Sequence, residues 1–421
     1  MTAPIGVSEV NRLEAETERL LAFGRRGRHP AGGFAWLQDD GTPDLDRDVE
    51  LWITCRMTHV YALGHLLGVD GAAELVDHGI AALAGRLHDD EHGGWYAAVG
   101  ADGPTTPTKG AYEHAFVVLA ATSAVVAQRP GAEAVLDEAL AVQERHFFHE
   151  GDGAVVDVYL DRGFADLEDY RGANANMHTV EAYLAAADVT GDEVWLQRAD
   201  RIVHRFVHGA AGGHGWRLPE HFDPDWRPRL DYHHDQPAHP FRPFGATVGH
   251  GFEWARLALH LEAARHPEVS QAGAGTQLRS DAAAQFRRAV EDGWSVDGAP
   301  GFVYTTDFDG TPVVRNRLHW VVNEATNAAA ALYLASGEAV YADWYRTWWT
   351  YAEDVFVDRE AGSWRHELDP DNRPAASVWA GKPDLYHAVQ ATLIPRLPLA
   401  PSLATALAEG RLDTSGASAR T

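Results

Sequence analysis

Alanine-rich apolar segments that end at a glycine recur along the chain. One runs from Met177 to Gly191 and another from Asn323 to Gly337, and each precedes a segment that opens with an acidic residue and then mixes charged and apolar positions. A glycine after an apolar run is typical of a left-handed helix C-cap, and an acidic residue suits the positive end of the next helix dipole. The pattern predicts helical hairpins in which the first helix is buried and the second is partly exposed.

The same pattern occurs in six parts of the chain. First helices are predicted to start near residues 56, 112, 177, 252, 323 and 385, about 55 to 75 residues apart, which fits a long helical hairpin and its loop. Second helices are predicted over 193–207 and 339–355, for example. Six hairpins can close into a ring with the first helices inside, so we predict an all-α (α/α)6 barrel.

The extent of the repeats predicts the domain organisation. They run from about residue 8 to about residue 398, so we expect one domain over 1–412 and a disordered tail over 413–421. Segments rich in glycine, aromatic and acidic residues follow several second helices, at 88–96, 212–217, 301–305 and 362–367. We predict that these segments form loops or short hairpins that close one mouth of the barrel and line the site.

Composition and charge narrow the class of partner. The 421 residues carry 35 Lys and Arg against 61 Asp and Glu, a formal charge of -26 that repels nucleic acid and anionic membranes. No apolar run approaches the roughly 18 residues of a membrane span, and the first 20 residues lack a signal-peptide core, so a cytoplasmic location is predicted. Cys55 is the single cysteine, which excludes an internal disulfide and a cysteine-based zinc site.

Candidate chemistry gathers at one end of the predicted first helices. His178, His250 and His387 all lie near the start of such a helix, as do Arg56 and either Glu113 or His114. If the ring closes, these helix starts meet at one mouth of the barrel. A histidine can remove a proton from a carbon next to a sugar carbonyl, an arginine can stabilise the enediolate oxygen, and a second histidine can assist ring opening.

Other patterns refine this prediction. The spacing of His250 and Glu253 puts both on one helical face, where the carboxylate would orient the imidazole. The clusters His88–His92 and His233–Asp235 lie in predicted loops without a second set of ligands, so no metal site is predicted. A nucleophile elbow, a phosphate-binding glycine loop and a dinucleotide fingerprint are absent, which argues against esterases, kinases and Rossmann dehydrogenases. With 14 Trp, 13 Tyr and 23 His, the composition suits a carbohydrate cleft.

Five further features are runs of sequence: Trp52-Ile-Thr-Cys-Arg-Met-Thr-His59, Asn174-Ala-Asn-Met-His178, Gly249-His-Gly-Phe-Glu-Trp-Ala-Arg256, His319-Trp-Val-Val-Asn-Glu324 and Trp379-Ala-Gly-Lys-Pro-Asp-Leu-Tyr-His-Ala388. They resemble the N-acylglucosamine 2-epimerase superfamily, and most closely its aldose–ketose isomerase branch. The resemblance covers almost the whole chain, and its motifs are long and widely separated. It implies an (α/α)6 barrel, no cofactor and an enediol route between an aldose and its ketose, chiefly D-mannose and D-fructose.

The same resemblance implies roles for individual residues. His250 and His387 are the expected acid/base pair, without a distinction as to which one moves the C2 proton. Trp320 is the expected sugar-facing aromatic residue. The further expected contacts to the substrate are Arg56, Asn174, His178, Glu253 and Asp384.

Several alternatives stay open at the level of sequence. A 2-epimerase shares the enediol and differs in where the proton returns, and a sulfoquinovose isomerase would need further cationic or donor groups for the sulfonate. A glycoside hydrolase on the same barrel would need two carboxylates that flank the scissile bond. A non-catalytic sugar-binding protein is the remaining class. The expected partner is in each case a small sugar, and the chain is predicted to be a monomer or a homodimer.

Overall fold

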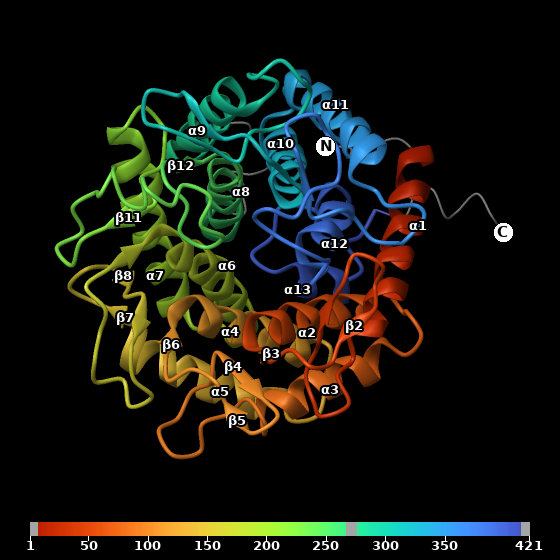
Figure 1. Cartoon of the computed structure of the whole chain (residues 1–421), viewed down its shortest axis with the longest axis vertical. Coiled ribbons are helices and arrows are strands. Elements are labelled where there is room, and N and C mark those ends of the chain that lie inside the picture. Colours follow the sequence, from red (N-terminus) through yellow and green to blue (C-terminus); the bar gives the residue numbers. More distant parts are fainter. Residues whose placement is uncertain (1–6, 267–275, 414–421) are drawn as a thin grey trace.

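Two concentric layers of helices make up the computed structural model, which describes residues 7–266 and 276–413 (Figure 1). The predicted tail 413–421 lies outside the described residues except for Asp413. Six helices of the described chain surround the barrel axis, and neighbouring members contact one another around the ring. These inner helices are α2 (Leu51–Leu66), α4 (Ala111–Val126), α6 (Ala173–Thr190), α8 (Val248–Arg265), α10 (His319–Ser336) and α12 (Tyr386–Leu393).

Each inner helix packs against one helix of an outer layer. The outer helices are α1 (Val7–Gly24), α3 (Ala72–Leu83), α5 (Ala132–Val142), α7 (Glu193–Val203), α9 (Gln277–Gly293) and α11 (Ala339–Val355). Shorter 3₁₀ or π turns lie at Arg25–Gly27, Gln143–Phe147, His204–Ala211 and Ile394–Arg396. The predicted (α/α)6 barrel is confirmed.

The sixth pair differs from the sequence prediction. We expected every first helix to be followed by its own second helix, but α12 packs against α1 from the other end of the chain. The segment after α12 instead forms the short α13 (Leu403–Ala408), which contacts α2 and α4. Because the two ends of the described chain close the ring together, we propose that residues 1–412 form one domain.

The burial of the two layers explains their composition. In α2 every residue from Leu51 to Gly64 is buried, because other helices or the barrel core surround it on all sides. In α11 the buried residues recur at helical spacing, with Tyr345, Trp348 and Ala352 toward the inner layer. Gly191 and Gly337 adopt the left-handed conformation that the hairpin pattern predicts, with φ of 70° and 74°. None of the described helices is long and apolar enough to cross a membrane.

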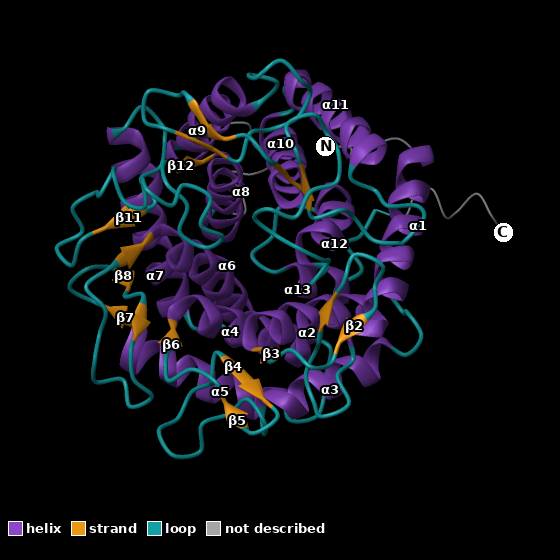
Figure 2. Cartoon of the chain, in the orientation of Figure 1, coloured by secondary structure: helices purple, strands orange, loops and turns teal. Residues whose placement is uncertain are grey.

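Short antiparallel strands lie among the loops at the rim of the ring (Figure 2). Five of them directly precede an inner helix and fix the level at which that helix begins. Each pairs with a strand from a following loop: β3 (Val49–Glu50) with β4 (Ala98–Gly100), which also pairs with β5 (Gly103–Pro104); β6 (Lys109–Gly110) with β9 (Val158–Tyr159); β10 (Arg171–Gly172) with β11 (His221–Phe222); β12 (Ala246–Thr247) with β13 (Thr305–Thr306), which also pairs with β14 (Pro312–Val314); and β15 (Arg317–Leu318) with β16 (Glu367–Leu368). The remaining pairs in the described chain are β1 (Trp36–Leu37) with β2 (Pro43–Asp44), and β7 (Phe148–His149) with β8 (Ala154–Val155).

This common starting level places equivalent positions of the inner helices in layers around the axis. The second residues of the five inner helices that follow a strand form a first layer: Trp52, Tyr112, Asn174, Gly249 and Trp320. Four residues later, about one turn further from the mouth, the second layer contains Arg56, Phe116, His178, Glu253 and Glu324. No strand precedes α12, and its second residue, His387, bonds to Glu324 of this second layer. The helix starts therefore converge on one mouth, as the sequence predicted.

Candidate active site

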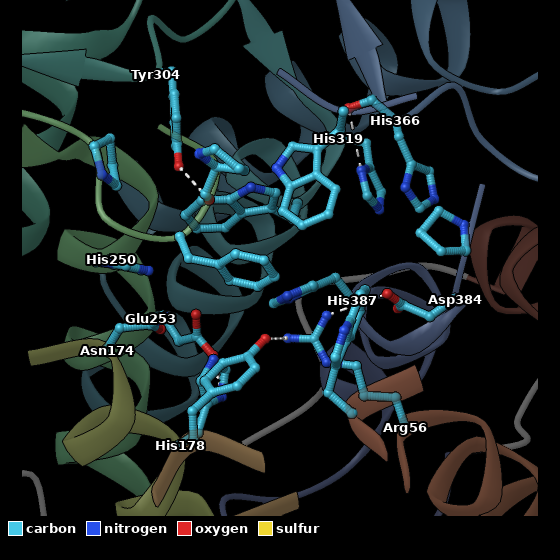
Figure 3. Close-up of a pocket in the computed structure, with 18 residues that line it drawn as sticks. Arg56, Asn174, His178, His250, Glu253, Tyr304, His319, His366, Asp384 and His387 are labelled. Carbon is cyan, nitrogen blue, oxygen red and sulfur yellow. Dashed lines mark hydrogen bonds and ion pairs between the residues drawn. The ribbon is translucent and has the colours of Figure 1, made fainter. Parts of the chain in front are cut away.

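A pocket lies at this mouth and is lined by residues of these two layers together with residues of the surrounding loops (Figure 3). All eight residues named from the sequence contribute to its wall: Arg56, Asn174, His178, His250, Glu253, Trp320, Asp384 and His387. Residues that the sequence did not single out complete it, and they are Trp52, Tyr112, Pro240, Phe241, Pro243, Tyr304, His319, His366, Trp379 and Pro383. Aromatic rings and imidazoles together thus make up most of the lining, and the other ionisable side chains are Arg56, Glu253 and Asp384.

His387 is held by a glutamate of the neighbouring inner helix. Its Nδ1 lies 2.9 Å from Oε1 of Glu324, and both side chains are buried. Because a carboxylate can only accept, Nδ1 carries the proton, and Nε2 is left with a lone pair. Burial lowers the pKa of His387 and the Glu324 hydrogen bond partly offsets that effect, so the pKa remains below the ordinary value. The imidazole is therefore neutral at neutral pH and suited to act as a base.

His250 has a matching partner that comes from outside the inner helices. Its Nδ1 lies 2.9 Å from Oε1 of Glu220, a buried residue just before β11. The sequence prediction that Glu253 orients His250 is therefore wrong. Glu253 instead has Oε1 3.8 Å from Nδ1 of His178. Since Glu220 lies 30 positions from His250, helical spacing could not have identified it.

Trp320 lies between the two histidines. Its ring centroid is 5.2 Å from that of His250 and 5.8 Å from that of His387. Gly249 gives the ring this space, because a Cβ at that position would lie 2.2 Å from the Trp320 ring. The glycine before His250 is therefore required by a close approach, and Trp320 provides an apolar surface for a sugar ring.

Arg56 is fixed on another side of the pocket. Its guanidinium donates hydrogen bonds to Oδ2 of Asp384 at 3.2 Å and to the Tyr112 hydroxyl at 3.0 Å (Figure 3). The carbon at the centre of the guanidinium also lies 4.5 Å from the centre of the Phe116 ring. The arginine is therefore rigid, and its charge is balanced by Asp384.

Glu253 is a buried carboxyl group with few partners. Its Oε1 has no hydrogen-bond partner within the described residues, and the side chain is 1% exposed. Burial and the nearby Glu324 carboxylate raise the pKa of Glu253 well above its usual range. The neighbouring His178 has its pKa lowered by burial and by Arg56. A neutral acid next to a neutral imidazole can donate a hydrogen bond to a sugar hydroxyl.

His319 and His366 form a stacked pair at the pocket wall. Their ring centroids are 3.8 Å apart with an interplanar angle of 20°. Burial lowers the pKa of His319 to about 3, and burial together with His319 lowers that of His366. His319 is the first residue of α10 and lies in a quoted run, whereas His366 comes from a loop. Both are neutral hydrogen-bonding groups. Sequence reasoning assigned neither one a role, although the segment 362–367 that contains His366 was expected to line the site.

Other predicted features have different outcomes. Tyr112 lines the pocket, and its neighbours Glu113 and His114 do not. His114 instead donates from Nδ1 to the Gly110 carbonyl and accepts from the Trp95 amide. Of the four loop segments expected to line the site, 301–305 contributes Tyr304 and 362–367 contributes His366, while 88–96 and 212–217 are not in the wall.

Residues of the two histidine-rich loop clusters form hydrogen bonds and ion pairs with neighbouring groups of the protein. His88 bonds to Asp90 and to Glu138, at 2.7 and 2.6 Å. Asp89 is buried and pairs with Lys109 at 2.9 Å. The Nδ1 atom of His233 lies 2.7 Å from the Arg242 carbonyl oxygen. These interactions stabilise the loops around the mouth.

Comparison with known proteins identifies the family. Residues 32–391 match the family model described as N-acylglucosamine 2-epimerase (GlcNAc 2-epimerase). The chain belongs to this family. The resemblance inferred from the five sequence runs is thereby confirmed.

Members of the N-acylglucosamine 2-epimerase family with high similarity carry one name. The chain is 55% identical to a D-mannose isomerase of Thermobifida fusca, over 94% of this chain and 96% of that protein. It is 51% identical to a D-mannose isomerase of Pseudomonas cannabina pv. alisalensis, over 94% of each chain. A solved structure titled "Crystal structure of D-mannose isomerase" superposes with a TM-score of 0.83 at 29% identity, covering 91% of this chain and 96% of that one.

Proposed function

We propose that this chain interconverts D-mannose and D-fructose through a cis-enediol. The observation that carries the proposal is the pair of buried histidines at the pocket, each with Nδ1 bonded to a glutamate, in a chain 55% identical to a D-mannose isomerase. Aldose–ketose isomerisation needs a base that removes the C2 proton and returns it to C1. It also needs a group that opens the sugar ring. Two oriented imidazoles meet these needs.

His387 is proposed as the base that moves the carbon-bound proton. Its Nε2 takes the proton from C2 of the open-chain aldose while O1 gains a proton, which gives the cis-enediol. O2 then gives up its hydroxyl proton as Nε2 delivers the carbon-bound proton to C1, which gives the ketose with no net gain or loss of protons. The lowered pKa of His387, which burial causes, keeps the imidazole neutral and ready to accept. His250 is proposed to transfer protons at the ring oxygen and the anomeric hydroxyl.

The oxygens of the enediol need donors as charge develops on them. Arg56 and the neutral carboxyl group of Glu253 are proposed for this task, because both line the pocket and both are rigidly held or buried. Asn174 and His178 are proposed to bind further hydroxyls. Trp320 is proposed to support the apolar face of the sugar between the two histidines.

The size and charge of the pocket favour an uncharged monosaccharide. Trp52, Trp379 and Phe241 contact one another at its wall, with ring centroids 5.2 to 6.3 Å apart. We expect these rings to hinder the binding of a second sugar unit. Arg56 is the one guanidinium or ammonium group that the described chain contributes to the wall, and Asp384 balances its charge. A sulfonate would therefore lack a free cation.

We also propose that the reaction needs no metal ion or organic cofactor. Two groups of residues have metal-ligand atoms close together, one of Glu253, Glu324 and His387 and one of His178, Glu181 and Glu253. The Arg256 guanidinium already contacts the glutamates of both groups, at 2.9 to 3.8 Å, and takes the place of a metal charge. Undiminished turnover after dialysis against EDTA is the expected result.

An NMR time course with purified protein and D-mannose tests the proposal. D-Fructose as the first product, with no product from a His387→Asn variant, is the expected result. D-Glucose as the first product would show a 2-epimerase instead. Faster turnover of sulfoquinovose than of mannose would show a sulfoquinovose isomerase, and release of reducing sugar from a disaccharide would show a hydrolase. Sedimentation of the same sample tests the predicted monomer or homodimer.

A further inference from the structure

One arginine lies below the pocket among three glutamates. Arg256 is one helical turn further from the mouth than Glu253 and is 2% exposed. Its Nε lies 2.9 Å from Glu324 Oε2, its Nη2 3.6 Å from Glu253 Oε1 and its Nη1 3.8 Å from Glu181 Oε1. The three glutamates come from α10, α8 and α6. Arg256 therefore joins three inner helices beneath the pocket without lining it.

The charges around Arg256 do not balance if every glutamate is ionised. One guanidinium faces three buried carboxyl groups, and the shortest contact, the hydrogen bond from Nε, goes to Glu324. Burial alone would raise the pKa of Glu324, but Arg256 and the hydrogen bond from His387 bring it below its usual range. Glu253 makes only the longer contact, and its pKa is raised by burial and by Glu324. In this arrangement Glu324 is an ionised carboxylate and Glu253 is a neutral acid.

The other ionisable groups near this cluster do not supply a second free cation. From α2, Arg56 is paired with Asp384. From α12, the Tyr386 hydroxyl donates to Glu181. The imidazoles near the cluster are His59 of α2, His178 of α6 and His260 of α8, and burial lowers the pKa of each. Within the described chain, and besides the hydrogen bond from His387, the ionisation of Glu324 therefore depends on the positive charge of Arg256.

We propose that Arg256 is a positioning residue for the isomerisation: it holds Glu324 ionised and in place, so that His387 keeps Nδ1 protonated and Nε2 basic toward the sugar. By its weaker contact with Glu253, the same guanidinium leaves that carboxyl group neutral and able to donate. The inference rests on the proposed function and adds a residue that does not touch the substrate. Arg256 acts on the proposed base through two hydrogen bonds, one from Arg256 to Glu324 and one from His387 to Glu324.

Removal of the guanidinium has a distinct consequence for the pH profile. In Arg256→Met, the charge that counteracts the effect of burial on the pKa of Glu324 is gone. Glu324 therefore binds a proton at higher pH and no longer accepts the hydrogen bond of His387 as a carboxylate. The acid limb of kcat then follows the ionisation of Glu324 and moves to higher pH, and alkaline buffer restores part of the lost rate. In Glu324→Gln no ionisable group is left at that position, so alkaline buffer restores nothing.

The experiment measures kcat and KM for D-mannose from pH 5 to pH 9.5 in four proteins. They are the wild type, Arg256→Met, Arg256→Lys and Glu324→Gln. We expect Arg256→Met to lose about tenfold to a hundredfold in kcat at pH 7 with KM changed less than threefold, and to recover at least part of it by pH 9. Arg256→Lys keeps the charge, so its acid limb is expected to stay near that of the wild type.

A matched control separates this effect from the loss of any buried ion pair. Arg279 of α9 binds Glu262 at 2.8 Å and is 7% exposed, away from the pocket. Arg279→Met is expected to lower the melting temperature and leave the pH profile of kcat unchanged. If Arg256→Met does not fold, the double variant Glu181→Gln/Arg256→Met, which removes one buried anion with the cation, takes its place.

Two results would overturn the inference. One is an Arg256→Met profile that matches the wild type in height and position. The other is a uniform fall in kcat at every pH with the acid limb unmoved, which would show a structural role only. Absence of fructose formation by the wild-type protein would instead contradict the proposed function, so the two failures are distinguishable.

Discussion

The two histidine–glutamate pairs of the pocket have the same hydrogen bond and different surroundings. His387 and Glu324 lie on adjacent inner helices, and Glu324 also receives a hydrogen bond from the buried Arg256. His250 lies on an inner helix, but Glu220 comes from the loop before β11 and has the Thr247 amide 3.4 Å away. Both Nδ1 to carboxylate distances are 2.9 Å. Local geometry is therefore shared, and the surrounding charge distinguishes the two roles.

The largest expected difference between the pairs comes from the histidines themselves. Asparagine can keep a donor near the position of Nδ1 but removes Nε2. We expect His387→Asn to lower kcat for D-mannose about 10³-fold or more, and His250→Asn about 10²-fold, because ring opening also occurs without the enzyme. Steady-state kinetics with circular dichroism as a folding control measure this. A larger loss in His250→Asn would reverse the assignment of the two roles.

The glutamates give the next largest difference. Glu324→Gln removes a charge that supports the proposed base, and we expect kcat to fall about tenfold to a hundredfold. Glu220→Gln keeps a hydrogen-bond acceptor for His250, and we expect a loss of less than about tenfold. Both values come from initial rates of fructose formation at saturating mannose. Equal losses would mean that the environment of Glu324 has no special effect.

Trp320 lies between the two histidine–glutamate pairs, and a substitution at Gly249 can displace its ring without replacing any residue of the pairs. In Gly249→Ala the new Cβ would lie 2.2 Å from the indole, so the ring must shift. We expect KM for mannose to rise about tenfold, which corresponds to about 1.4 kcal/mol of binding. Gly251→Ala on the same helix is the control, since its Cβ would meet the Ala289 methyl at 3.2 Å and Cγ of Gln285 at 4.0 Å and would not touch Trp320. An unchanged KM in Gly249→Ala would argue against a sugar-facing role for Trp320.

The smallest expected effect is on the pH dependence of the free energy of unfolding, through two histidines near His387. His319 and His366 stack there, and burial lowers the pKa of His319 to about 3. Below the ordinary value near 6.5 the unfolded chain binds a proton that folded His319 does not, so the free energy of unfolding falls as pH falls. The slope reaches about 1.4 kcal/mol per pH unit for each such group. Urea unfolding between pH 6.5 and 5 should therefore depend less on pH in His319→Gln than in the wild type, and equal slopes would count against a neutral buried imidazole.

The comparison also shows which parts of the molecule the sequence could predict. The hairpin pattern identified the inner helices, and the residues named near their starts, including His178 and His387, reached one pocket, except Glu113 and His114. This succeeded because the short strands before the inner helices set a common level, so sequence position determines height along the axis. Counting from the helix starts would have found Tyr112 and Glu324 as well.

The features that the sequence did not predict depend on loops or on the closure of the ring. Glu220 and His366 lie outside the helical repeats, so no periodicity marks them. The spacing of His250 and Glu253 was misleading, since Glu220 from outside α8 bonds to Nδ1 of His250, and Glu253 faces His178 instead. The pairing of α12 with α1 was missed because it joins the two ends of the described chain and leaves no local signal.

The most direct test of the central claim follows the hydrogen atom at C2 of mannose. D-Mannose carrying deuterium at C2 is incubated with the wild type, His387→Asn and His250→Asn, and the label is followed by NMR. We predict that the wild type removes the label from C2 as fructose forms, that His250→Asn does so more slowly, and that His387→Asn does not. Loss of the label from C2 at the wild-type rate in His387→Asn would contradict the account.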